Sequence, residues 1–131
     1  MYNLGLALVD EKEDNINREY NENKLFEVIK IAKKNKFLVV VYLIVGFPWQ
    51  TKNEIIKKID LLSKLNVIVG VSIFYPIKGT KIFNDYKKNF ENIKFCQMRS
   101  TGLYLETENI TRQDLVDIMK YSYEKNKNCK I

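Results

Sequence analysis

The sequence predicts one α/β domain, residues 1–131, with a parallel sheet of about four βα units. Short apolar runs recur along the chain with their starts about 30 residues apart, a spacing typical of βαβ units. Each run is followed by turn-forming residues and then by a helical pattern. A length of 131 residues suits one domain, and 46% hydrophobic residues exclude a disordered chain.

The predicted strands are apolar almost without alternation. They cover Leu4–Val9, Leu38–Val45 and Val67–Tyr75. Strands that are buried on both faces have this pattern, and they belong to parallel sheets covered by helices. We expect a fourth strand over Gly102–Glu106, after a less regular stretch.

The first two predicted helices place apolar residues on one side at helical spacing. The first covers about Lys24–Asn35 and the second about Thr51–Leu65. Thr51 and Glu54 have the spacing of a capping box, which marks the start of the second helix. The residues expected to face the core are Leu25, Val28, Ile29 and Ala32 in the first helix and Ile55, Ile59 and Leu62 in the second.

Two further helices are expected near the end of the chain. A short one covers about Thr80–Lys88, and the last one is capped by Thr111. The chain starts on a strand, and nothing in the pattern marks a protected sheet edge, which is typical of part of a larger barrel. The residues expected to face inward are Ile82, Phe83 and Tyr86 in the short helix and Leu115, Ile118 and Met119 in the last.

The charge is typical of a solvated surface. The net charge is +6, and 19 of the 22 basic residues are lysines that are mixed with acidic residues on expected outer helix faces. Nucleic-acid readers more often cluster arginine with stacking aromatic residues, so we do not expect a nucleic-acid partner. The chain contains no histidine, which excludes His-based triads and His-ligated zinc.

The sequence also bears on the compartment. No apolar run reaches the roughly 20 residues of a membrane-spanning helix, so we expect no membrane association. The first residues lack a basic leader and a small-residue cleavage site. Cys96 and Cys129 provide no disulfide framework, and by themselves they cannot hold a metal ion or cluster. We therefore expect a cytoplasmic protein.

Ligands of α/β folds bind beyond the carboxyl ends of the strands, where the turn at residues 46–50 is the most informative segment. Gly46 permits close approach to the backbone, and Pro48 fixes the direction in which the chain leaves the strand. The helix that begins at Thr51 presents free N–H groups. A tight βα turn explains the same residues without any ligand.

The next strand ends in a similar segment, residues 75–80, in which Pro76 and Gly79 shape a loop before a helix. Tyr75 would line a flat pocket for an aromatic ring, or it would belong to the core together with Phe74.

Three sets of charged residues are weaker candidates. Glu106 and Glu108 would point to one face of a strand as an acid/base pair, or they would be solvated or favour the N-terminus of the next helix. Arg18 would bind a carboxylate, or it would form a surface ion pair. The acidic residues Asp10, Glu11, Glu13 and Asp14 are more typical of a solvated loop than of a metal site.

Two motifs within residues 39–83 carry a family resemblance. GFPWQT, residues 46–51, ends one strand, and YPIKGTKIF, residues 75–83, ends the next. In order and spacing they resemble the GFPGET-like turn and the PxPGT-like loop in the second half of a radical S-adenosylmethionine (radical SAM) domain. The flanks NLGLALVDEKEDNINREY and TGLYLETENITRQDLVDIM are similar to cobalamin-associated Fe–S oxidoreductases, which include anaerobic cyclase and methyltransferase-like enzymes.

The resemblance spans nearly the whole chain and implies part of a TIM-like barrel that works with SAM and a [4Fe–4S] cluster. In that family the reduced cluster cleaves SAM to a 5′-deoxyadenosyl radical. The resemblance places Arg18 near the SAM carboxylate. It also implies that Ile44 and Gly46 lie near the adenine and ribose of SAM, that Phe47 and Pro48 form the adjoining turn, and that Phe74, Tyr75 and Pro76 approach the adenine.

The sequence departs from the family at the cluster. The CxxxCxxC loop that holds the cluster through three thiolates is missing, so no cluster is expected in this chain. Trp49 and Gln50 stand where the family has Gly and Glu. We assign no catalytic residue.

Three functional hypotheses follow. The first is a fragment of a radical SAM Fe–S oxidoreductase that supplies part of the SAM pocket, is inactive alone, and has the missing N-terminal half of the domain as its partner. The second is a non-catalytic α/β binding or assembly module that associates with a second copy of itself. The third, an RNA-contacting piece of a modification enzyme, rests on the basic charge alone.

Overall fold

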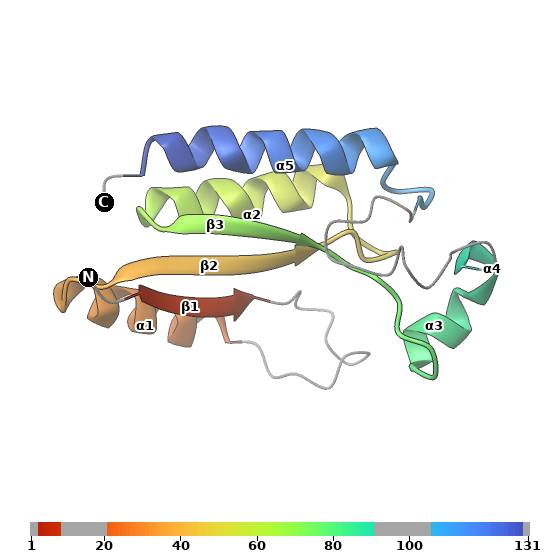
Figure 1. Ribbon diagram of the computed structural model, residues 1–131, viewed down its shortest axis with the longest axis horizontal. Coiled ribbons are helices and arrows are strands. Elements are labelled where there is room, and N and C mark those ends of the chain that lie inside the picture. Colours follow the sequence, from red (N-terminus) through yellow and green to blue (C-terminus); the bar gives the residue numbers. More distant parts are fainter. Residues whose placement is uncertain (1–2, 9–20, 91–105, 130–131) are drawn as a thin grey trace.

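The computed structural model describes residues 3–8, 21–90 and 106–129 of the chain. Three strands, β1 (Asn3–Leu8), β2 (Leu38–Val45) and β3 (Ile68–Ile73), form a parallel sheet in the order β1-β2-β3 (Figure 1). The predicted α/β class with a parallel sheet is confirmed. Of the expected fourth strand, only Glu106 lies within the described residues, and it is in a loop.

The helices begin where the sequence places capping residues. Thr51 and Glu54 form the predicted capping box of α2 (Lys52–Lys64), and Thr111 forms a second one at α5 (Arg112–Lys127) with Asp114. Asn21 caps α1 (Glu22–Lys34). The single short helix expected over residues 80–88 is instead two, α3 (Lys81–Asp85) and α4 (Lys87–Phe90).

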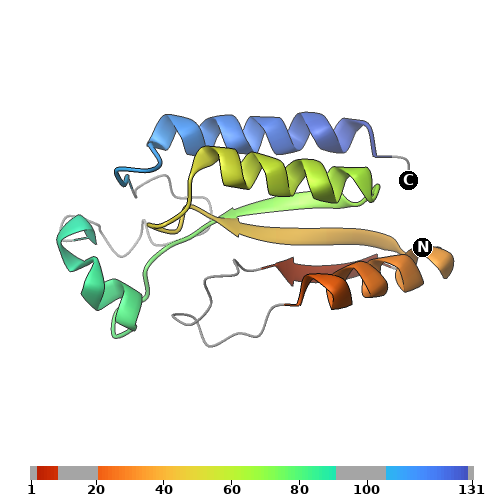
Figure 2. The same ribbon diagram turned by 180° about the vertical axis from the view of Figure 1, so that it is seen from behind.

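The helices α1 and α2 cover one face of the sheet, as the view from behind shows (Figure 2). Along β2, buried side chains on this face alternate with less buried side chains on the other face. Side chains of Val39, Val41, Leu43 and Val45 are buried in the core, whereas Tyr42 on the other face is 49% exposed. The prediction that the strands are buried on both faces is therefore wrong for β2.

The core lies between this face and the helices, and it contains most of the expected residues. Those buried as predicted are Ile29, Ala32, Ile55, Ile59, Leu62, Ile82, Leu115 and Ile118. Two predictions are wrong: Val28 is 41% and Met119 is 36% exposed. Both lie on the border of an amphipathic helix face, where spacing alone does not determine burial. Phe83 and Tyr86 are half-buried.

The helix α5 packs against α2 and β3. It runs alongside both, so that it borders the sheet on the β3 side (Figure 1). Within the described part of the chain, no helix is long and apolar enough to cross a membrane.

Candidate functional site

The carboxyl ends of β2 and β3 meet in an apolar group of side chains, here called the aromatic cluster. Phe47 lies at its centre, with its ring centroid 5.0 Å from that of Trp49 and 4.4 Å from that of Phe74. Phe47 is only 2% exposed, and its ring packs against both neighbours. The members of the aromatic cluster are Ile44, Phe47, Trp49, Phe74, Ile82 and Tyr86.

The turn after β2 is held by the side chain of Gln50. Its Oε1 accepts hydrogen bonds from the backbone N–H groups of Gly46 at 2.8 Å and Phe47 at 3.1 Å. The backbone N–H of Gln50 donates to the Phe47 carbonyl at 3.0 Å. Because Gln50 is 3% exposed, these bonds satisfy backbone donors that water does not reach.

Gly46 is required by this turn for two reasons. Its φ of +89° lies in the left-handed region that favours glycine. A Cβ at this position would also stand 3.2 Å from Leu115 Cδ2 of α5. The space beside Gly46 is therefore filled by a core side chain, as the interpretation of residues 46–50 as a tight βα turn requires.

The structure brings only some of the predicted site residues together. Ile44, Phe47 and Phe74 share the aromatic cluster, and Pro48 and Pro76 are also buried. The Pro48 carbonyl accepts a hydrogen bond from Asn109 Nδ2 at 3.2 Å. Tyr75 is 37% exposed and so offers a ring to solvent beside the cluster.

Sequence reasoning missed the part that three other residues play at this site. The four-residue spacing of Ile82 and Tyr86 predicted that both lie on one face of a helix. It did not show that this face packs on Phe47, as it does in the structure. Trp49 was noticed only as a departure from the family motif. Its Nε1 is buried and has no hydrogen-bond partner among the described residues.

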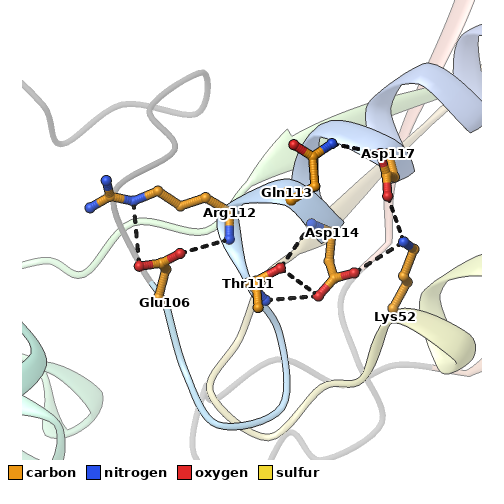
Figure 3. Close-up of polar contacts among 7 residues, drawn as sticks. All are labelled: Lys52, Glu106, Thr111, Arg112, Gln113, Asp114 and Asp117. Atoms are coloured by element: carbon orange, nitrogen blue, oxygen red, sulfur yellow. Dashed lines mark hydrogen bonds and ion pairs between the residues drawn. The ribbon is translucent and has the colours of Figure 1, made fainter.

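Glu106, the last residue of the expected fourth strand, and Glu108 do not have the arrangement predicted for an acid/base pair. Residues 106–110 form a loop, so Glu106 and Glu108 do not alternate on a strand there. Glu106 Oε1 instead accepts a hydrogen bond from the backbone N–H of Arg112 at 3.2 Å, in the first turn of α5 (Figure 3). The alternative that Glu106 favours the helix N-terminus is confirmed, and Glu108 is exposed.

A charged group joins α2 to α5 next to this loop (Figure 3). Lys52 Nζ lies 3.0 Å from Asp114 Oδ1 and 2.7 Å from Asp117 Oδ2. Hydrogen bonds from the backbone and side chain of Thr111, with a further bond from Lys52, lower the pKa of Asp114 to about 2. Asp114 binds Thr111 and Lys52, and Asp117 binds Lys52. These carboxylates are therefore part of helix capping and packing.

No metal site is found within residues 3–8, 21–90 and 106–129, where no group of three or more Cys, Asp or Glu side chains could hold an ion. Cys129 is a free, half-buried thiol just beyond the end of α5. Arg18, Cys96 and the acidic residues of 10–14 lie outside the described residues.

No protein-family model matches the chain, and no curated protein matches it. The candidate site therefore has to be interpreted from its own geometry and from its motifs.

Proposed function

We propose that this chain is part of a cytoplasmic radical SAM Fe–S oxidoreductase and supplies the strands that bind the adenine and ribose of SAM. In this proposal the N-terminal half of the domain provides the cluster-binding loop, and the chain alone is not catalytically competent. The observation that carries it is that Ile44 and Phe74, from the two strands that bear the family-like motifs, share one apolar cluster.

The sheet supports the same proposal. Its strands follow one another in chain order and are all parallel, with α1 and α2 on one face. Strands of a βα barrel have this order, and their second face points into the barrel. On that second face the exposed Tyr42 and the half-buried Val40 and Ile44 follow one another along β2.

The side chains present fit only the nucleoside part of SAM. Adenine is planar and apolar on its faces, and Tyr75 with the half-buried Ile44 and Phe74 offers a surface of matching chemistry. The cluster does not fit this chain, because its sequence contains two cysteines and the cluster requires three closely spaced thiolates. SAM, when bound to the complete domain, would be the source of the radical.

Titration calorimetry of the purified chain with SAM and with adenosine tests the nucleoside pocket. We expect binding of both compounds with a Kd below about 1 mM, since the adenosine moiety carries the contacts. Tyr75→Ala should weaken binding by about tenfold, the value of one aromatic stacking contact. Tyr123→Ala is the matched control, because Tyr123 is 64% exposed on α5 and should leave the affinity unchanged.

Absence of heat with both ligands at millimolar concentration would contradict the proposal. If the chain then also sediments as a stable dimer, the second hypothesis, a non-catalytic module that self-associates, is favoured.

A further inference from the structure

Side chains of α5 occupy the outer edge of β3 at Val69. The backbone N–H of Val69 donates to Asn126 Oδ1 at 2.9 Å. The carbonyl of Val69 accepts from Asn126 Nδ2 at 2.9 Å and from Ser122 Oγ at 2.9 Å. One carboxamide thus pairs with both backbone groups of a strand residue, as one residue of an antiparallel neighbouring strand would.

These backbone groups are the ones that would bind a further strand. The backbone N–H of Phe74 donates to the Val45 carbonyl at 2.7 Å, so the backbone groups of Phe74 point toward β2. Backbone groups of successive strand residues point to opposite sides, which directs those of Val69 away from β2. No additional strand can therefore pair with β3 at Val69 while α5 stays in place.

Ser122 and Asn126 are held firmly in this position. Ser122 is 3% exposed, and Leu115 and Ile118 on the same helix are completely buried in the core. Tyr121 Oη donates to Asp60 Oδ1 at 2.7 Å, and Lys125 Nζ lies 2.7 Å from the same oxygen. Helix α5 is thereby fixed to α2 on both sides of Ser122.

We propose that Ser122 and Asn126 form an edge lock, which prevents a strand of another chain, a second copy included, from pairing with β3. Native sheets protect their edges from such pairing in several ways, and cover by a helix is one of them. Pairing of a second copy with β3 at Val69 is thereby blocked. A strand that extends the sheet therefore joins at β1 and not at Val69, and this part of the inference rests on the proposed function, in which the N-terminal half is that partner.

Hydrogen exchange and sedimentation of variants test the edge lock. In Asn126→Ala we expect the amide of Val69 to exchange about tenfold faster, because its acceptor is lost. In Asn126→Asp the acceptor remains but the donor to the Val69 carbonyl is lost, so the amide should exchange faster than in the unmodified chain and no faster than in Asn126→Ala. The matched control is Asn128→Ala, which changes an exposed asparagine of the same helix end.

The Ser122→Ala, Asn126→Ala double variant tests whether the edge then accepts a second copy. Its sedimentation coefficient should increase with concentration relative to Asn128→Ala, and exchange at Val69 should slow again as the chains pair. Wild-type exchange at Val69 in Asn126→Ala would overturn the proposal. So would a double variant that stays folded, exposes Val69 and sediments like the control at every concentration.

The two Asn126 single variants keep the test decisive if the double variant does not fold. Exchange of Val69 that is no faster in either variant than in Asn128→Ala would then overturn the proposal. SAM plays no part in these measurements, so the edge lock and the proposed function fail independently.

Discussion

The ring of Tyr42 on β2 occupies the space that a side chain of Gly70 on β3 would need. A Cβ on Gly70 would stand 2.9 Å from Tyr42 Cδ1, closer than such atoms approach one another. On the other side of the ring, a Cβ on Gly5 of β1 would stand 3.3 Å from Tyr42 Cε2. Glycines on both neighbouring strands therefore leave room for one aromatic ring on the face of the sheet opposite α1 and α2.

Gly70→Ala should lower the free energy of unfolding by about 1–3 kcal/mol, because the methyl group forces the Tyr42 ring or the strand to shift. Urea unfolding measures this difference. Gly5→Ala should lower the free energy of unfolding by less, since the contact between its Cβ and the Tyr42 ring is longer. In a Tyr42→Ala background the penalty of Gly70→Ala should largely disappear, and an equal penalty in both backgrounds would show that the ring is not its cause.

Gly46→Ala should destabilise the protein more than Gly79→Ala does. The two glycines have nearly the same φ, +89° and +88°, so both substitutions carry a backbone penalty of about 1–2 kcal/mol. A Cβ at Gly79 has no neighbour within 4 Å, whereas one at Gly46 meets Leu115. The difference between the two thermal or urea midpoints reports the packing contribution, and equal midpoints would refute it.

Gln50→Leu should cost about 2–4 kcal/mol in stability, because the buried N–H groups of Gly46 and Phe47 lose their acceptor. Gln50→Glu retains an acceptor oxygen at this position and should cost less than Gln50→Leu at about pH 4, where the buried carboxyl group is protonated. Urea unfolding at about pH 4 compares the two variants. If they prove equally destabilised, the hydrogen bonds to the turn do not account for the burial of Gln50.

Stability should decrease in acid partly because of Asp114. Its pKa is lowered from the usual 3.8 to about 2 in the folded protein, so the carboxylate stabilises the fold above about pH 4. This contribution is lost as the pH falls from about 4 toward 2, because the unfolded chain then takes up a proton first. Asp114→Asn should remove that part of the pH dependence.

Urea midpoints measured between pH 2 and pH 6 test the role of Asp114. Asp85→Asn serves as the control, since Asp85 is exposed on α3, and it should follow the unmodified chain. An unchanged acid profile in Asp114→Asn would contradict the prediction.

Local sequence was sufficient for the elements that local interactions form. The apolar run of β2, the capping box at Thr51 and the cap at Thr111 need only neighbouring residues, and the structure confirms them. Residue spacing also placed Ile59 and Ile118 in the core, because one face of each helix is continuously apolar. By contrast, Val28 and Met119 lie at the borders of those faces, where neighbouring elements decide exposure.

The candidate site could be predicted only in part. The motifs directed attention to Ile44 and Phe74, which do share a cluster. They did not show that Phe47 would be enclosed by Trp49, or that Gln50 would bond to the turn, because the same residues also suit an exposed loop. Side-chain direction at such a turn depends on backbone conformation and packing that residue identity does not specify.

The sequence by itself determined the class of the fold, the places where helices begin and the glycine needed after β2, since each depends on backbone preferences within a few residues. Only the tertiary structure decided that Tyr42, on the face of the sheet opposite α1 and α2, stays half exposed. It also decided that Asn126, 57 positions after Val69, pairs with the edge of β3. Contacts between residues so distant along the chain arise from the packing of whole elements, and no local pattern records them.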